Sequence, residues 1–220
     1  MSRSIRADGE ATRGRILEVA GEFLASKGLA DTTSKEIAER AGVNMASINY
    51  HFGSRGGLYK AVLAEAHRRL IDRDDLDRLF ASNLPAHRKL HGLIGFLVDG
   101  GAGAARWPIM VLGRELLSPS PHLASLQQEE IFPKLRIILP VLHEISTIPA
   151  DDPVLWRCLP CVVAPCIMTV LLSRAKPGLD EVSGPMSRDD LIDHLCRYAI
   201  GGLEAIGRAH GNEASRAPRC

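Results

Sequence analysis

The sequence predicts an all-α fold, with an N-terminal helix-turn-helix domain of three helices followed by a larger helical C-terminal domain. The first reason is that apolar residues recur at helical spacing along most of the 220-residue chain. The second is that no sustained alternation of polar and apolar residues, which a half-buried strand would show, is found. The third is that aromatic residues, which favour strands, make up only 5% of the chain.

The first two predicted helices are separated by clear start and stop signals. The first helix places its apolar residues on one face and ends at Gly28. The second begins after Thr33, where Glu36 three residues later completes a capping box. It breaks at Gly42, a residue type that accepts the left-handed backbone of a tight turn. A tight turn between two short helices predicts helix-turn-helix geometry.

The third and fourth predicted helices follow directly. Asn44 is a good N-cap for a short helix over about residues 45–51, and Ser54 caps the next helix. Gly56 and Gly57 lie in the first turn of that fourth helix, and each weakens a helix by up to ~1 kcal/mol relative to alanine. We therefore expect a soft junction between the N-terminal domain and the rest of the chain.

The remaining elements are also predicted to be helices. The charged segment 72–87 is expected to contain the end of the fourth helix and a connection. Prolines at 133 and 140 are expected to bend or divide one later helix, and Ser187 caps the last one. The expected domains are 1–55, 56–210 and a disordered tail over 211–220. The further predicted helices cover about residues 85–100, 107–117, 122–145, 152–173 and the region after Ser187.

One set of residues in the third helix has no role in the predicted core. Asn side chains can bind adenine edges, and Ala or Met can contact a thymine methyl group. Tyr, Ser and His suit phosphate oxygens. No acidic residue lies between Glu39 and Glu65, so nothing in this stretch of sequence repels phosphate. The residues left for the exposed face are Met45, Ala46, Ser47, Asn49, Tyr50 and His51.

The stretch "TTSKEIAERAGVNMASINYHFGSRGGLYKAVL" resembles the N-terminal domain of TetR-type transcriptional repressors, and the match covers about residues 11–65. The resemblance implies an all-helical homodimer with a DNA-binding domain and a C-terminal ligand-binding and dimerisation domain. "WPIMVLGRELLSPSPHL" faintly resembles the regulatory domain of a CecR-like branch. By position, the implied DNA-binding residues are Thr33, Ser34, Ser47, Tyr50, His51 and Arg55 on phosphates, Met45, Ala46 and Asn49 on bases, and Asn44 beside them.

Two residues depart from the family pattern. Asn49 stands where the family often has a tyrosine, which makes it a candidate specificity determinant. Arg55 and Gly56 replace a more usual Lys-Glu pair. The partners expected are therefore a double-stranded DNA operator, a small-molecule effector and a second copy of the chain.

The last two predicted helices favour a dimer interface. The helix over 152–173 is apolar nearly all round, and Gly201 and Gly202 would permit close helix approach. Two such helices from each subunit can form a four-helix interface. A monomer that buries both helices internally is the alternative. The apolar stripe on the last helix is Leu191, Leu195, Ala199, Leu203 and Ile206.

Other interpretations receive less support from the sequence. Cys158, Cys161 and Cys166 could form a thiol sensor or a soft-metal site, but their apolar neighbours favour plain packing, so no metal or cofactor is expected. The apolar run 158–173 is shorter than the ~20 residues of a membrane span, and no apolar segment follows Met1, so a cytoplasmic protein without a membrane partner is expected.

We therefore expect a dimeric repressor that a small, largely apolar molecule releases from a pseudo-palindromic operator. That molecule would bind among the fourth to eighth helices, where polar residues on apolar helices could line a pocket. Arg114 and Glu115 are neighbours, so at most one of them should face inward. A helical module without DNA binding is one alternative. An enzyme is the other, although no nucleophile elbow, phosphate loop or H-E-x-x-H motif is present. The polar candidates for the pocket are His91, Arg114, Glu115 and His143.

Overall fold

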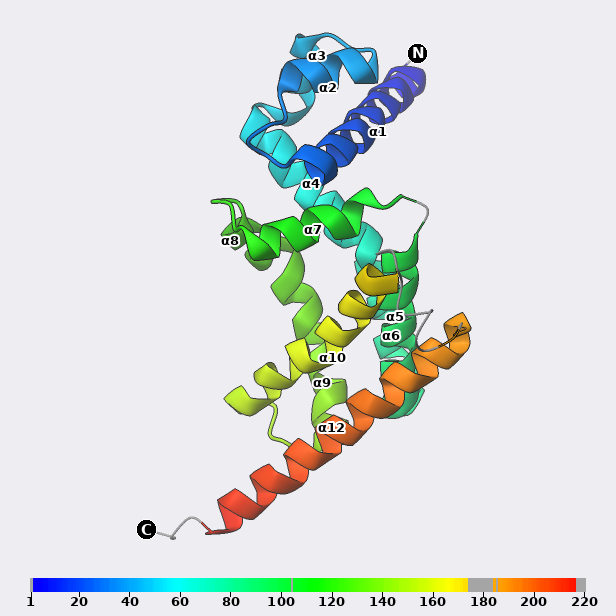
Figure 1. The fold of residues 1–220 in the computed structure, drawn as a ribbon, viewed down its shortest axis with the longest axis vertical. Helices are drawn as coiled ribbons and strands as arrows, with labels where there is room; N and C mark the ends of the chain where they lie inside the picture. The colour runs from blue at the N-terminus through cyan, green and yellow to red at the C-terminus, as the bar shows by residue number, and fades with distance from the viewer. Residues whose placement is uncertain (1, 104, 174–183, 185, 217–220) are drawn as a thin grey trace. The chain divides into compact units, whose positions relative to one another are not determined.

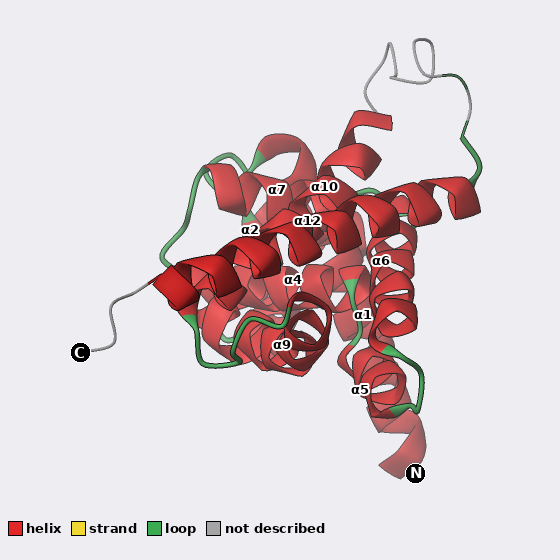
Figure 2. Cartoon of the chain, turned by 90° about the horizontal axis from the view of Figure 1, so that it is seen from below, coloured by secondary structure: helices red, strands yellow, loops and turns green. Residues whose placement is uncertain are grey.

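The structure, a computed structural model, describes residues 2–103, 105–173, 184 and 186–216. Within these ranges the chain consists of helices and loops, and no strand is present (Figure 2). The all-α fold class predicted from the sequence is therefore confirmed.

The chain divides into two compact units. The first unit is formed by Met1–Leu70 together with Gly103–Ile131, and the second by Ile71–Ala102 together with Phe132–Cys220. Each unit is described by itself below. The units are defined by packing, so the functional boundary expected after residue 55 stays a prediction.

The first unit contains the helix-turn-helix segment and three later elements (Figure 1). α4 packs against α1, α3 and α7, and α1 packs against α2 and α7. This arrangement places the short helices α2 and α3 on a scaffold of longer ones. The elements are α1 (Ser2–Lys27), α2 (Ser34–Ala41), α3 (Met45–Phe52), α4 (Arg55–Leu70), α7 (Trp107–Leu117), α8 (Leu123–Leu126) and the π-helical turn η1 (Gln127–Ile131).

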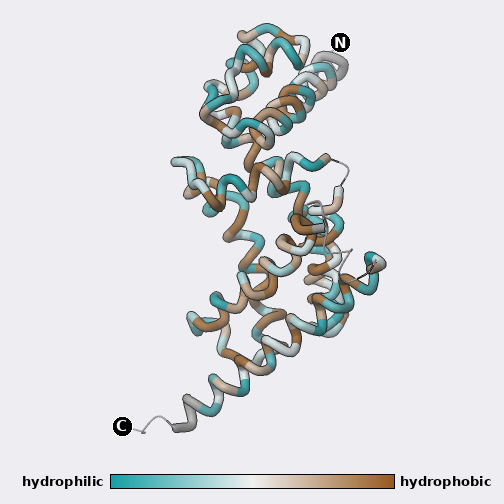
Figure 3. The backbone as a smooth tube through the Cα atoms, in the orientation of Figure 1, coloured by the Kyte–Doolittle hydropathy of each residue, from teal (hydrophilic) through white to brown (hydrophobic). Residues whose placement is uncertain are grey.

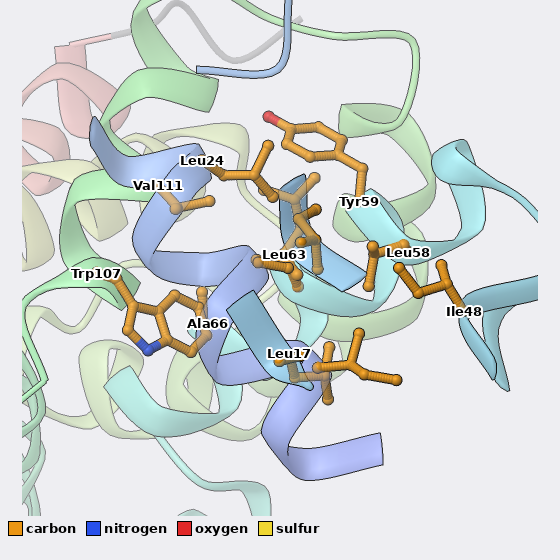
Figure 4. Packing of buried hydrophobic residues seen from close by; sticks show 14 of the residues in the cluster. Leu17, Leu24, Ile48, Leu58, Tyr59, Leu63, Ala66, Trp107 and Val111 are labelled. Atoms are coloured by element: carbon orange, nitrogen blue, oxygen red, sulfur yellow. The ribbon is translucent and has the colours of Figure 1, made fainter. Parts of the chain in front are cut away.

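Trp107 at the start of α7 joins that helix to α1 and α4. Its indole is buried in the core cluster that Figure 4 shows. A Cβ atom at Gly21 would overlap this ring, so the glycine permits the close approach. The indole N–H donates to Glu18 at 2.9 Å, and Arg69 stacks on the ring 4.9 Å away while pairing with the same Glu18. Apolar packing and a half-buried ion pair thus hold α7 in place.

The second unit is built around α6, which packs against α9, α10 and α12. Polar and apolar residues alternate along its helices (Figure 3), as expected for helices that bury one face. α12 carries an ion pair to α6, between Arg188 and Asp99 at 2.5 Å. The elements are α5 (Arg73–Ala81), α6 (Ala86–Ala102), α9 (Phe132–Ser146), α10 (Pro153–Ser173) and α12 (Arg188–Arg216).

The segment 72–87, predicted to be a connection, contains the helix α5, so this prediction was wrong. Asp72 caps α5 by accepting a hydrogen bond from the backbone of Asp74. Leu76 is fully buried, while the charged residues of α5 lie on the side of the helix that is exposed or half-exposed to solvent. A single buried leucine gives little hydrophobic periodicity, and the helix was missed for that reason.

The helix predicted over residues 122–145 is divided, as its prolines indicated. α8 gives way to η1 immediately before α9, and Pro133 is the second residue of α9. Pro133 has no N–H to donate to the carbonyl four residues back, so one α-helical hydrogen bond is missing where the π turn lies. Pro140 is accommodated inside α9.

The C-terminal helix is longer than the sequence analysis expected. α12 continues through residues 211–216, where a disordered tail was predicted, and residues 217–220 lie outside the described part of the chain. The sequence contains no proline between Ser187 and Pro218, so nothing in residues 211–216 forces the helix to stop.

Candidate nucleic-acid interface

The start of α2 is fixed by the predicted capping box. The backbone N–H of Thr33 donates to Glu36 Oε2 at 3.0 Å, and the N–H of Glu36 donates to Thr33 Oγ1 at 3.2 Å. Lys27 Nζ lies 2.9 Å from Glu36 Oε1. The hydrogen bond from Lys27 and those from Thr33 lower the pKa of Glu36 to about 2. These contacts anchor α2 to the end of α1.

The turn between α2 and α3 has the geometry that the sequence predicted. Gly42 adopts a left-handed backbone with φ of 65°. Its N–H donates to the carbonyl of Glu39 at 3.2 Å, and the N–H of Val43 donates to the carbonyl of Ala38 at 3.0 Å. Two of the last carbonyls of α2, those of Ala38 and Glu39, therefore accept hydrogen bonds at the point where the chain turns into α3.

α3 begins with Asn44 as its N-cap, also as predicted. Both the N–H and the hydroxyl of Ser47 donate to Asn44 Oδ1, at 2.8 and 2.9 Å. Ile48 is fully buried in the core of the first unit. The cap and the buried isoleucine fix how α3 is rotated about its axis, and hence which residues it presents outward.

The outward face of α3 is polar or small in most positions. Tyr50 is 85% exposed and Met45 is 45% exposed. The Tyr50 and His51 rings meet edge to face with centroids 5.1 Å apart. At the candidate positions, Thr33, Asn44, Met45, Ala46, Asn49, Tyr50 and Arg55 are exposed, and Ser34, Ser47 and His51 are half-buried.

The junction between α3 and α4 is closely packed at Gly57, and the softness expected of this junction stays a prediction. Gly53 has a positive φ of 73°. The N–H of Gly57 donates to Ser54 Oγ at 3.0 Å, in agreement with the predicted cap. A Cβ atom at Gly57 would overlap the carbonyl oxygen of Phe52, and one at Gly56 would lie 3.2 Å from the imidazole of His122. Gly57 is therefore present because α3 and α4 approach closely, and an alanine there would clash.

The side chain of Arg55 forms hydrogen bonds to the backbone of the same chain. Its guanidinium donates to the carbonyl oxygens of Leu29 and, at 3.3 Å, Ala30. It thereby ties the loop before α2 to the start of α4. The phosphate contact expected of Arg55 stays a prediction.

Lys60 forms an ion pair that sequence reasoning missed. Its Nζ lies 2.7 Å from Glu129 of η1 and lowers the pKa of that carboxyl group. The two residues are 69 positions apart, so no local pattern could reveal the pair. The surface near α4 is therefore less positive than the absence of acidic residues between Glu39 and Glu65 indicated.

Glu115 is a second polar group whose partners the sequence did not reveal. It is 1% exposed and accepts hydrogen bonds from the hydroxyl of Tyr59 at 2.6 Å and from Ser120. Arg114 points away from it and donates to the carbonyls of Ala25 and Ser26 at 2.8 and 3.0 Å. The expectation that at most one of the two neighbours faces inward is confirmed. Burial and the contact with Glu115 raise the pKa of Tyr59.

The three cysteines of α10 differ in exposure. Cys158 and Cys166 are buried, while Cys161 is exposed. Burial raises the pKa of Cys166 to about 11 and also raises that of Cys158. The protonated thiol is neither a nucleophile nor a metal ligand, so these surroundings favour a packing role for the two buried cysteines. Among the described residues, no group of three or more His, Cys, Asp and Glu residues could hold a metal ion.

α10 is longer than the apolar run recognised in the sequence. Its segment Pro153–Leu172 is long and apolar enough to cross a membrane by length and composition, and 33% of an 18-residue stretch within it is buried. Core helices of soluble proteins can be equally long and apolar. One face, which includes Leu159 and Val162, is buried, whereas Trp156, Met168 and Leu172 are exposed.

The apolar stripe predicted on the last helix faces the protein's own core over most of its length. Leu203 is 2% exposed, and Leu195 and Ala199 are also buried. Within the chain, α12 makes a close approach at Gly207, where a Cβ atom would overlap the carbonyl of Ser146. A Cβ atom at Gly201 or Gly202 would meet nothing within 4 Å, so the close approach to a partner predicted there stays a prediction. Among the described side chains of α12, the large apolar ones that are exposed are Tyr198 and Ile206.

Comparison with known proteins agrees with this geometry. The family described as "Bacterial regulatory proteins, tetR family" matches residues 16–62, which include all of α2 and α3. The HTH-type transcriptional regulator SrpR of Pseudomonas putida is 31% identical over 99 residues, which cover 45% of this chain and 44% of SrpR. The uncharacterized HTH-type transcriptional regulator TtgW, also of Pseudomonas putida, is 30% identical over 99 residues, covering 45% of this chain and 69% of TtgW.

Solved structures share the fold over most of the chain. A bacterial regulatory protein of the tetR family from Rhodococcus RHA1 has a TM-score of 0.67 at 18% identity and covers 87% of this chain and 96% of its own. The ketosteroid transcriptional regulator KstR2 of Mycobacterium tuberculosis has a TM-score of 0.61 at 20% identity, covering 86% and 93%. The match to TtgW, the matched helix-turn-helix segment and this common fold show that the chain belongs to the TetR family of DNA-binding bacterial transcriptional regulators.

Proposed function

We propose that the protein is a cytoplasmic repressor that binds a pseudo-palindromic DNA operator as a homodimer and is released from it by a small molecule. The observation that carries this proposal is the outward face of α3. Asn44 caps this helix, Ile48 anchors it in the core, and side chains that bind bases or phosphates remain exposed.

The residues of this face would divide their roles by chemistry. Asn49 would bind an adenine edge, and Met45 and Ala46 would contact base edges or thymine methyl groups. Asn44 would position the start of α3 through its cap. The hydroxyl, imidazole and guanidinium groups expected to meet phosphates are those of Thr33, Ser34, Ser47, Tyr50, His51 and Arg55.

The proposed dimer would use the exposed apolar side chains of α10 and α12. Trp156 and Met168 on α10 and Tyr198 on α12 are exposed to solvent. A hollow of about 460 Å³ lies between these helices, and Cys161, Tyr198, Gly202 and Ile206 are among the residues that line it. Exposed apolar surface of this kind marks interaction sites. A dimer would present two α3 helices to half-sites roughly 34–36 Å apart, one turn of DNA.

In this proposal residues 1–55 form the DNA-binding domain, and residues 56–210 serve dimerisation and effector binding. The proposal is supported by the family and by the relatives named as transcriptional regulators. A helical module that does not bind DNA is the second candidate. No feature of the described residues favours it over the repressor.

The test is selection of binding sites from random double-stranded DNA by the full chain, followed by affinity measurements at several salt concentrations. We expect a two-fold symmetric consensus and an affinity that falls steeply as salt rises. Failure to enrich any sequence, or an affinity for DNA that does not depend on salt, would contradict the proposed function.

Two tyrosines provide a matched pair of variants. Tyr50→Phe and Tyr198→Phe each remove one exposed hydroxyl, from α3 and α12 respectively. Tyr50→Phe should weaken binding to all operator variants by about 0.5–1.5 kcal/mol, because one phosphate hydrogen bond is lost. Tyr198 belongs to the proposed dimer face, so Tyr198→Phe is measured at concentrations where sedimentation velocity shows a dimer, and its operator affinity should then equal that of the wild type. Equal effects of the two substitutions would argue against a DNA contact at Tyr50.

A further inference from the structure

A cleft in the first unit is bounded by the end of α1, the start of α4 and the end of α7. Its volume is about 700 Å³, within the range of small-molecule sites. The apolar part of its lining includes Leu24, Leu29, Tyr59 and Val111. Figure 4 shows that Leu24, Val111 and Tyr59 lie close to one another at one end of the core cluster. The core of the unit thus supplies a hydrophobic floor to the cleft.

The other part of the lining carries positive charge. Lys27, Arg55 and Arg114 all line the cleft, and no acidic residue does. The guanidinium groups of Arg55 and Arg114 donate hydrogen bonds to backbone carbonyls. These carbonyls are neutral, so the positive charge of the two arginines is not compensated by them. Lys27 is paired with Glu36.

One further carboxylate, Glu115, lies close to this lining. It is buried and receives hydrogen bonds from Tyr59 and Ser120, both of which line the cleft. The lining itself therefore carries three cations and no carboxylate, while Glu36 and Glu115 contact lining residues from outside it. This charge favours an anionic occupant over a neutral or cationic one.

The mouth of the cleft exposes an apolar side chain. Leu117, at the end of α7, is 90% exposed and lines the cleft. Leu116 beside it is 68% exposed but is not part of the lining. An occupant with a hydrocarbon part could cover Leu117, which a phosphate or another small inorganic anion could not do.

We propose that this cleft binds an amphipathic organic carboxylate, with the carboxylate near Arg55 and Arg114 and the hydrocarbon part over Leu24, Tyr59 and Leu117. A guanidinium donates paired N–H groups that match the two oxygens of a carboxylate. The hydrocarbon part would gain free energy from the apolar area that it removes from water.

Such an occupant would also act on the DNA-binding surface, and this part of the inference rests on the proposed function. Arg55 holds the carbonyls of Leu29 and Ala30 in the loop that leads into α2, and it is itself a proposed phosphate contact. A carboxylate bound to Arg55 competes with both partners. The occupied cleft therefore weakens operator binding through a residue that the two sites share.

The experiment measures binding of octanoate to the full chain in the absence of DNA by isothermal titration calorimetry. Octanol and octyltrimethylammonium, which have the same chain length, are the matched probes. Octanoate should bind with a dissociation constant below about 1 mM, and at least about tenfold more tightly than either matched probe. Equal binding of the three probes, or no octanoate binding, overturns the proposal.

Leu117→Asp and Leu116→Asp locate the site. Both substitutions replace an exposed leucine at the end of α7 with the same negative charge, and neither removes a buried side chain. Leu117→Asp should weaken octanoate binding by about tenfold or more, through repulsion and lost apolar contact. Leu116→Asp should change it by less than about twofold, because that side chain lies outside the lining. Equal losses in the two variants would place the binding site elsewhere.

The coupling to DNA is read separately. A concentration of octanoate that just saturates the wild type should lower the operator affinity of the wild type and of Leu116→Asp. The same concentration should have little effect on the operator affinity of Leu117→Asp, which binds octanoate more weakly. Octanoate that binds without changing operator affinity overturns the coupling while the carboxylate site remains. Because octanoate binding is measured without DNA, its failure is distinguishable from a failure of the proposed operator binding.

Discussion

Helices α3 and α12 each leave one face uncovered in the described chain, but the residues on the two faces have opposite chemistry. The face of α3 presents side chains that donate or accept hydrogen bonds, such as Asn49 and Tyr50. The exposed part of α12 presents Tyr198 and Ile206 next to glycines whose added Cβ atoms would meet nothing within 4 Å. A hydrogen-bonding face suits the edges of bases, whereas an apolar face suits another protein surface.

The two faces also differ in how their orientation is fixed. α3 is oriented by contacts within a few residues, namely the Asn44 cap and the Gly42 turn, together with the buried Ile48. α12 is oriented by packing against distant helices, such as the close approach of Gly207 to Ser146. The sequence therefore indicates which residues α3 exposes more readily than which residues α12 exposes.

The largest expected effect comes from a charge placed on the apolar faces of α10 or α12. Met168→Arg and Tyr198→Arg each put a cation where the proposed dimer would bury an apolar side chain. The dimer should lose about 3–5 kcal/mol of association free energy, because a buried charge is left unpaired. Sedimentation velocity over a range of concentrations would report monomers for both variants.

Leu84→Arg is the control for this experiment. Leu84 is an exposed apolar residue between α5 and α6, so the substitution adds the same charge away from α10 and α12. It should leave the dimer intact. Dimers that persist in Met168→Arg and Tyr198→Arg would mean that the interface lies elsewhere. Leu203 is unsuitable for such a test, because it is buried in the subunit's own core.

The second prediction concerns the junction that holds α3 on α4. Gly57→Ala should destabilise the first unit by about 3 kcal/mol, since its Cβ atom would overlap a backbone carbonyl that has little room to move. Urea unfolding would measure the loss. Gly113→Ala is the control, because a Cβ atom there meets nothing within 4 Å and alanine favours the α7 helix by up to ~1 kcal/mol. Equal stability of the two variants would contradict the close approach.

Sequence reasoning succeeded where both partners of a contact lie within one helical turn. The pairs Thr33–Glu36 and Asn44–Ser47 are three residues apart, and their caps were predicted correctly. It failed where distant segments meet, as in Lys60–Glu129 and Tyr59–Glu115. The side chains of such a pair carry no mutual pattern in the sequence. Only the packing of α4 against η1 and α7 brings them together.

The third prediction tests whether the α3 face reads bases. Asn49→Ala should relax the preference at one base-pair position by about 1–3 kcal/mol, because an amide that binds adenine at two atoms is lost. Titration of single-base operator variants would show the change. Tyr50→Phe is the comparison, and it should lower affinity for all variants equally. A uniform loss in Asn49→Ala would assign this residue to positioning and not to base recognition.

The smallest expected effect comes from the capping box that precedes α2. The pKa of Glu36 is lowered from 4.5 to about 2 in the folded chain, chiefly by Lys27 and then by Thr33. A carboxyl group with a depressed pKa stabilises the fold above its unfolded pKa, and this stabilisation is lost as the pH falls toward the folded pKa. Glu36→Gln keeps a capping amide but removes the charge, so the wild type should be slightly more stable at pH 7, and the difference should shrink below about pH 4.5. Urea midpoints from pH 7 down to about pH 3.5 would measure this difference in stability.

Glu39→Gln is the control. Glu39 lies on the exposed side of the same helix with Lys35 4.0 Å away, so this variant should differ less from the wild type at every pH. If the gap between Glu36→Gln and the wild type instead widened toward acid, the Lys27 and Thr33 contacts would not be stabilising the carboxylate in solution.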